Sequence, residues 1–207
     1  KIEGPLIPSG LPGSFEQSAA WADVDRDGRL DIIVAGGPYE IEGATESLMG
    51  TEERLFLGVS NMNFMEQPLP KPSAEGQAFV AAPVDVDNDG DLDIYIVNDF
   101  GMFIAPNRLL INDGKGNYSD GSDASDTDVA LWGMGLAVGD IDNDGWLDLY
   151  VTTMAPLDDA LLRNLGGGVF DDVTVEWGAS STLIDGGVAW GAIFIDADND
   201  GDEDLFV

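Results

Sequence analysis

The chain has 207 residues, of which 44% are hydrophobic, so it can bury a real core as one domain. Its 40 Asp and Glu stand against only eight Lys and Arg, which gives a net charge of −32. Such a chain repels nucleic-acid phosphates and anionic lipid headgroups, and we expect neither as a partner.

The sequence contains neither Cys nor His. This absence excludes thiolate and imidazole metal sites, and also Cys and Ser–His nucleophile systems. Any metal must be bound by oxygen, which points to a hard cation such as Ca²⁺ or Mg²⁺. No stretch reaches the roughly 18 consecutive apolar residues of a membrane-spanning helix, so we expect no membrane insertion.

After a Pro- and Gly-rich stretch at 1–13, one acidic pattern occurs four times along the chain. Each copy reads D-x-D-x-D-G-x-x-D, and the copies lie at 23–31, 85–93, 140–148 and 196–204. Their starting points are 55–62 residues apart. Four matches at nearly constant spacing indicate a repeat architecture.

Runs typical of β-strands flank each acidic stretch. Small and apolar residues precede it, and short β-rich runs such as 94–97 follow it, so each acidic stretch is predicted to join two strands of a hairpin. A second predicted hairpin follows, for example 107–112 and 118–119 around a Gly- and Asn-rich turn. Four-stranded units that repeat in tandem are the blades of a β-propeller.

We therefore predict an all-β fold: a partial β-propeller of about 3.5 four-stranded blades with calcium-binding hairpin loops. A single domain spans 1–207. The fourth predicted blade is incomplete because the sequence stops after its second strand. We therefore expect either that the chain is a fragment, or that the N-terminal stretch or another chain completes the blade. The predicted blades are 14–78, 79–130, 131–186 and 187–207.

Each acidic loop offers a set of oxygen ligands. Asp occupies positions 1, 3, 5 and 9, and Gly at position 6 allows the sharp turn that folds these carboxylates around one point. Position 7 is expected to add its backbone carbonyl, and the Asp at position 9 can bind through both oxygens. Six or seven oxygens suit Ca²⁺ better than the strict octahedron of Mg²⁺. The predicted metal-binding residues are Asp23, Asp25, Asp27, Arg29, Asp31, Asp85, Asp87, Asp89, Asp91, Asp93, Asp140, Asp142, Asp144, Trp146, Asp148, Asp196, Asp198, Asp200, Asp202 and Asp204.

Two other interpretations of these loops are weaker. The EF-hand needs Glu at position 12 and flanking helices, whereas position 12 is apolar in all four loops. A turn that binds nothing would leave four carboxylates crowded without a cation, and they would repel one another. We expect up to four Ca²⁺ ions whose role is to maintain the fold. Because loops of this kind fill at extracellular calcium concentrations, an exported protein is favoured.

The stretch 132–151, WGMGLAVGDIDNDGWLDLYV, resembles the FG-GAP/VCBS repeat family, and 107–118 and 190–196 agree with it. The greatest similarity is to the cartilage-acidic-protein (ASPIC/UnbV-type) branch, and the acidic loops are similar to those of integrin alpha-chain propellers. The resemblance covers about 14–207. It implies a secreted or surface-exposed β-propeller, typically of about seven blades, used for adhesion or protein interaction.

We expect a calcium-stabilised extracellular module for protein–protein interaction, adhesion or self-assembly into a multimer or filament. The alternative is a non-catalytic propeller part of a larger secreted enzyme or carbohydrate-binding protein. The most tightly clustered carboxylates are assigned to calcium and no separate nucleophile–base set is found, so we expect no enzyme activity in this segment.

Four tryptophans and one asparagine are further candidates for a structural or surface role. Trp21, Trp132 and Trp190 precede or open the acidic hairpins, and we favour core packing between blades over a sugar-binding platform. Trp146, inside the third loop, is expected near the surface and is the best single candidate for an interface contact. Asn117 begins an N-glycosylation sequon on a predicted turn.

Overall fold

The computed structural model describes residues 14–38, 53–60, 63–72, 74, 76–180 and 187–207. These residues form fourteen β-strands and no helix, so the prediction of an all-β fold is confirmed. Within this part of the chain there is accordingly no helix long and apolar enough to cross a bilayer.

The strands form three four-stranded antiparallel sheets and one two-stranded sheet. Hydrogen-bonded neighbours follow one another along the chain, so each sheet is a simple meander. The first sheet contains β1 (Ser14–Ala22), β2 (Asp31–Pro38), β3 (Arg54–Ser60) and β4 (Asn63–Gln67). The second contains β5 (Gln77–Val84), β6 (Asp93–Asp99), β7 (Arg108–Asn112) and β8 (Tyr118–Asp120). The third contains β9 (Gly135–Gly139), β10 (Asp148–Thr152), β11 (Ala160–Asn164) and β12 (Phe170–Asp172), and the last pair is β13 (Ile193–Ile195) and β14 (Asp204–Phe206).

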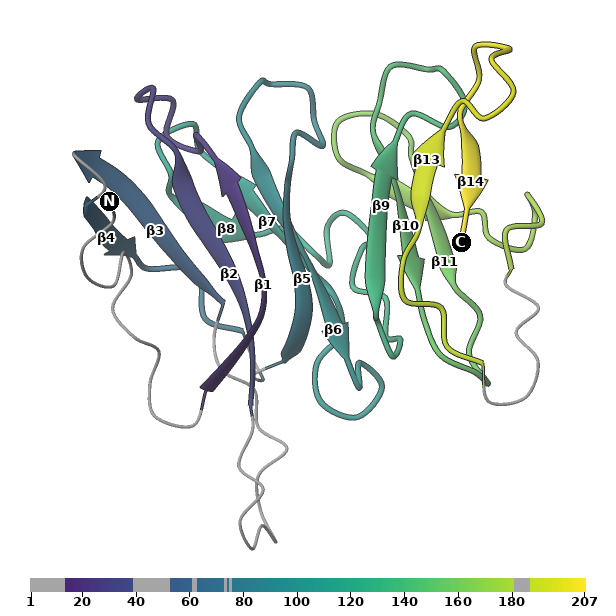
Figure 1. The fold of residues 1–207 in the computed structure, drawn as a ribbon, viewed down its shortest axis with the longest axis horizontal. Helices are drawn as coiled ribbons and strands as arrows, with labels where there is room; N and C mark the ends of the chain where they lie inside the picture. The colour runs from purple at the N-terminus through teal and green to yellow at the C-terminus, as the bar shows by residue number, and fades with distance from the viewer. Residues whose placement is uncertain (1–13, 39–52, 61–62, 73, 75, 181–186) are drawn as a thin grey trace, which may run out of the picture.

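The four sheets stand side by side in chain order, as the blades of a propeller do (Figure 1). The turns that join β1 to β2, β5 to β6, β9 to β10 and β13 to β14 all lie at the upper edge in this view. These four turns are the acidic stretches of the sequence. The repeat therefore places every predicted metal loop on one side of the molecule.

Apolar side chains fill the space between neighbouring sheets. On β6, Ile94 packs in a cluster shared with the first sheet, whereas Tyr95 packs in a cluster shared with the third sheet. Successive side chains of a strand point to opposite faces, so a strand between two other sheets must be apolar on both. All residues of β6 are accordingly buried. A third cluster joins Tyr150 and Leu161 of the third sheet to Phe194 of β13.

The expected core position of two tryptophans is wrong. Trp21 is 52% exposed and Trp190 is 64% exposed. Trp21 pairs in register with Ile32, so its ring lies on the face of the first sheet that points away from the second sheet. There its ring meets the Phe64 ring edge to face, with 5.9 Å between the ring centroids. Trp132, by contrast, is half-buried.

The inter-sheet core yields a first prediction. Leu162 is fully buried between the second and third sheets, whereas Leu165, just beyond β11, is 55% exposed. Leu162→Ala should lower the free energy of unfolding by about 2–5 kcal/mol, because it removes buried methyl groups and leaves a cavity. Leu165→Ala should change it by less than about 0.5 kcal/mol. Denaturant unfolding of both variants measures the difference, and equal effects would contradict this packing.

Candidate metal centre

The four acidic loops share one backbone conformation. The Gly at position 6 has a φ of 85° to 100° in every loop, which favours glycine because a Cβ is strained there. The residue at position 4 also has a positive φ, between 56° and 63°. The same two left-handed residues therefore bend all four loops in the same way. The position-6 glycines are Gly28, Gly90, Gly145 and Gly201, and the position-4 residues are Arg26, Asn88, Asn143 and Asn199.

A hydrogen bond across each loop sets its curvature. The carboxylate at position 1 accepts from the backbone N–H of the position-6 glycine, at 3.0, 3.0, 2.9 and 3.2 Å in loops one to four. The carboxylate at position 5 accepts from the N–H at position 7, at 2.7 to 3.0 Å. These bonds turn the carboxylates inward, toward the centre of the loop.

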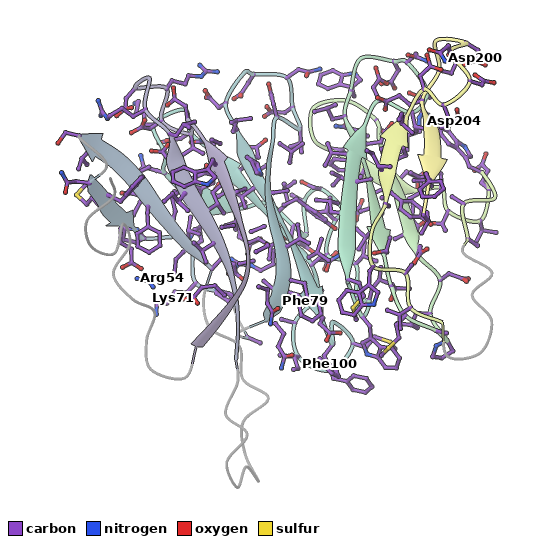
Figure 2. All side chains as sticks on the ribbon, viewed as in Figure 1. Arg54, Lys71, Phe79, Phe100, Asp200 and Asp204 are labelled. Carbon is purple, nitrogen blue, oxygen red and sulfur yellow. The ribbon has the colours of Figure 1, made fainter. Side chains whose placement is uncertain are left out.

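The Asp at position 9 ties the loop to the sheet. Asp31, Asp93 and Asp148 are buried, and one oxygen of each accepts the N–H of position 2, at 2.8, 3.2 and 3.0 Å. The other oxygen of each accepts an N–H from the third strand, donated by Gly58 within β3, by Asn112 at the end of β7 or by Asn164 at the end of β11, in each case at 2.8 Å. In the fourth loop, Asp204 is exposed (Figure 2), and among the described residues it makes the first type of bond alone, to the Ala197 N–H at 3.0 Å.

The loops bring carboxylates close enough to share one cation. In each loop, three carboxylates have oxygen atoms within 4.8 Å of one another. Two ligands on opposite sides of a Ca²⁺ ion lie about 4.6–5.2 Å apart, so this spacing fits that ion. The groups are Asp23, Asp25 and Asp27; Asp85, Asp87 and Asp93; Asp140, Asp142 and Asp148; and Asp196, Asp198 and Asp204.

Buried oxygens without partners point to the same ligand. Within the described residues, one carboxylate oxygen each of Asp23, Asp85 and Asp142 is buried and accepts no hydrogen bond. A buried carboxylate oxygen left unpaired is costly, and nearly all buried polar atoms in folded proteins are paired. A hard cation at the loop centre would supply the missing partner, so the residues present fit Ca²⁺.

Burial also shifts the pKa values of several loop carboxyls. Burial, with a smaller contribution from neighbouring carboxylates, raises the pKa of Asp93 and of Asp148 to about 6. Burial also raises the pKa of Asp31 and Asp87. A bound divalent cation acts in the opposite direction because it favours the ionised carboxylate.

Arginines supply part of the counter-charge. The guanidinium of Arg163, on β11, lies 2.6 Å from Asp142 and 3.3 Å from Asp144 in the third loop. Arg26 of the first loop lies 2.6 Å from Asp91 of the second. Among the described residues, these loops are thus partly neutralised by the few basic side chains the sequence contains.

The remaining predicted residues have varied surroundings. Trp146, at position 7 of the third loop, is only half-buried, as expected, and its ring packs against the turn at Gly166. Arg29, at position 7 of the first loop, forms an ion pair with Asp27 within its own loop. Position 7 thus has Arg, Asp or Trp in the four loops. This variety is what is expected if the residue provides a metal ligand only through its backbone carbonyl.

Sequence reasoning missed two asparagines that connect neighbouring sheets. The Asn112 side chain donates to the carbonyls of Val24, 2.9 Å away in the preceding acidic loop, and Leu92 at 3.0 Å. Asn164 repeats the arrangement one sheet later, at 2.8 and 3.1 Å. The signal was present in the sequence, since both residues close the third strand of their repeat, where the first repeat has Gly58.

The raised pKa values predict an unusual pH dependence without metal. In the unfolded chain Asp93 and Asp148 titrate near 3.8, and in the folded chain at about 6. The folded state therefore keeps these protons to higher pH, and its extra stability is lost as pH rises from about 4 to 6. In excess chelator, the free energy of unfolding should fall by about 2–3 kcal/mol per group over this interval. Denaturant midpoints at a series of pH values test this, and a rise with pH would contradict it.

Comparison with known proteins agrees with this architecture. Residues 85–151 match the FG-GAP-like repeat family, and no curated protein matches the chain. The chain resembles the exotype rhamnogalacturonan lyase YesX, with a TM-score of 0.52 and 14% identity, over 99% of this chain and 40% of that one. It also matches the rhamnogalacturonan lyase YesW, with a TM-score of 0.49 and 13% identity, over 93% of this chain and 40% of that one. The chain thus spans about two fifths of the length of these lyases. It contains an FG-GAP-like repeat within a β-propeller-type fold.

Proposed function

We propose that this chain is a calcium-stabilised extracellular β-propeller module that binds proteins or further copies of its own kind and has no catalytic activity itself. The observation that carries the proposal is the set of four equivalent loops on one edge, each with three converging carboxylates. Among the described residues, each of the first three loops has a predicted metal-binding Asp with a buried carboxylate oxygen that lacks a hydrogen-bond partner.

Calcium would act on the fold through these loops. The carboxylates at positions 1, 3, 5 and 9 would hold the ion, with the position-7 carbonyl as a further ligand. Because the position-9 Asp of the first three loops also anchors the third strand, an ion held by it would stiffen the whole sheet. Ion binding that requires the folded loop adds to the free energy of unfolding.

An extracellular location follows from the same chemistry. Extracellular calcium modules bind with dissociation constants of about 10⁻⁴–10⁻³ M, which is enough only where calcium is abundant. The fourth loop, whose three clustered carboxylates are all exposed, is of this open type. The proposed relatives, the cartilage-acidic-protein branch and integrin alpha chains with similar loops, are consistent with such a location.

Exposed apolar side chains support a role in protein contact. Ile193 and Ile195 project from one face of β13, and Phe206 is exposed on β14. Ile193 pairs in register with Phe206, so these side chains lie side by side on one face of the two-stranded sheet. Contiguous exposed apolar side chains of this kind mark surfaces for other protein chains.

The alternative is a non-catalytic propeller part of a larger secreted enzyme or carbohydrate-binding protein. The likeness to YesX favours it, because almost all of this chain aligns with two fifths of a polysaccharide lyase. In that case the neighbouring part of the longer protein would carry the reaction, and the propeller would support it or bind its polysaccharide.

Calcium dependence gives the first test. Added calcium should raise the melting temperature, by about 3–6 °C for each loop filled at tenfold its dissociation constant. Asp85→Asn should remove the second loop's contribution to this rise in melting temperature, because it takes a negative charge from position 1 of that loop's carboxylate cluster. Asp171→Asn, an equal charge change on exposed β12, should leave the calcium response intact. Thermal melting followed by circular dichroism, with calcium and with chelator, measures the calcium response of the wild type and of both variants. If calcium does not raise the melting temperature of the wild type, the calcium proposal is overturned.

Measurements of what the chain binds distinguish the leading proposal from the alternative. The leading proposal predicts calcium-dependent self-association or capture of a protein partner, whereas the alternative predicts binding to glycans. Light scattering after size exclusion, over a range of concentrations, should show species heavier than the monomer. A calcium-loaded monomer at every concentration, together with binding on a glycan array, would favour the alternative instead.

A further inference from the structure

The acidic loops touch one another through the same position. From the first loop, Arg26 forms an ion pair with Asp91 of the second at 2.6 Å. From the second loop, the Asn88 side-chain amide donates to the carbonyl of Gly145 in the third at 2.8 Å. Asn143 of the third loop donates to the carboxylate of Asp202 in the fourth, also at 2.8 Å. Each contact runs from position 4 of one loop to positions 6–7 of the next.

The backbone explains why position 4 makes these contacts. Its φ of 56° to 63° is left-handed, a conformation that Asn adopts more readily than most residues. All four loops have this conformation, and in three of them the side chain extends to the following loop. Asn199 has the same conformation in the fourth loop, and the described residues include no further acidic loop for its side chain to reach. Within the described part of the chain, it therefore serves as a control.

The contacts end at positions 6 and 7, which lie beside the expected metal ligands of the next loop. Gly145 precedes Trp146, whose N–H is bonded to the Asp144 carboxylate at 3.0 Å and whose carbonyl is an expected ligand. A hydrogen bond to the Gly145 carbonyl fixes the peptide that joins these two residues. Asn88 thus restrains one side of the third loop while belonging to the second.

We propose that the position-4 side chains couple the four loops, so that the metal sites fill as a linked row and not independently. The proposal rests on the calcium binding proposed above. When a cation orders one loop, its position-4 residue becomes fixed and holds positions 6–7 of the next loop near their bound geometry. The second ion then meets a loop that is already ordered, and it binds more tightly. By linkage, the effect is reciprocal between neighbours.

The first link differs in chemistry from the others. Arg26 reaches its partner over Gly90, where a Cβ would lie only 2.6 Å from the guanidinium nitrogen. Its ion pair with Asp91 is partly exposed, so salt screens it. The amide links of Asn88 and Asn143 carry no charge on the donor. Coupling between the second and third loops should therefore persist at salt concentrations that weaken the first link.

The third loop allows one site to be observed alone. Trp146 occupies position 7 of this loop, so its indole can transfer excitation energy to a Tb³⁺ ion held by the same loop. Tb³⁺ is a hard cation of similar size to Ca²⁺ and takes the same oxygen ligands. Trp146→Phe identifies the part of the Tb³⁺ emission that comes from this loop.

The experiment compares two matched variants of the full chain. Asn88→Gly keeps a residue suited to positive φ but removes the link to the third loop. Asn199→Gly makes the same change at a position that forms no link to another acidic loop among the described residues. Asn88→Gly should raise the Tb³⁺ concentration that gives half-maximal Trp146-dependent emission about fivefold. This is the change in affinity expected from the loss of one hydrogen bond. It should also make the titration less steep. Asn199→Gly should leave both unchanged, and circular dichroism checks that each variant folds.

The outcomes separate this proposal from the calcium proposal. Absence of Trp146-dependent emission in the wild type would overturn metal binding by the third loop, and the coupling with it. Normal emission with no shift in Asn88→Gly, or an equal shift in Asn199→Gly, would overturn the coupling alone.

Discussion

The buried carboxylate at position 9 is the interaction on which the rest of the structure depends. Asp93 accepts the N–H of Val86 with one oxygen and the N–H of Asn112 with the other. It thereby joins the acidic loop, the second strand and the third strand of a sheet at one point. The desolvation of this carboxylate opposes ionisation, whereas a cation in the loop favours it. The atoms that hold the sheet together at this point are therefore also atoms that would bind the proposed cation.

Polar contacts then extend this unit from sheet to sheet. The apolar clusters between sheets are non-directional and would tolerate small shifts of one sheet along another. The Asn112 amide, bonded to carbonyls of its own loop and of the preceding loop, permits one relative position only. On the second sheet, the buried guanidinium of Arg108 lies 3.4 Å from the Glu53 carboxylate, which precedes β3 of the first sheet. Hydrophobic burial thus holds the sheets together, and these bonds fix their register.

Much of this arrangement could be predicted because it is repeated locally. The D-x-D-x-D-G-x-x-D pattern encodes the loop backbone, and the adjoining β-rich runs encode the hairpin. A single copy of the motif does not encode contacts between repeats, so it does not predict that Asn88 contacts the third loop. Asn112 and Asn164 recur at one position of the repeat, but this recurrence does not identify their partners in the preceding loop. The exposure of Trp21 was missed for a related reason. Its hydrophobicity predicts burial, but its register opposite Ile32 places it on the face away from the second sheet.

Several of the few basic side chains of this acidic chain lie beside carboxylates and neutralise only part of their charge. The described arginines act largely as counter-ions, as Arg163 does beside Asp142 and Asp144, and too few basic residues exist to neutralise the loops. Adding more arginines would compete with a metal for the same carboxylate oxygens. Under the proposed calcium binding, leaving the carboxylates unpaired would make the folded state sensitive to the supply of divalent cations. The loops would then link that supply to the order of the sheets in this chain of net charge −32.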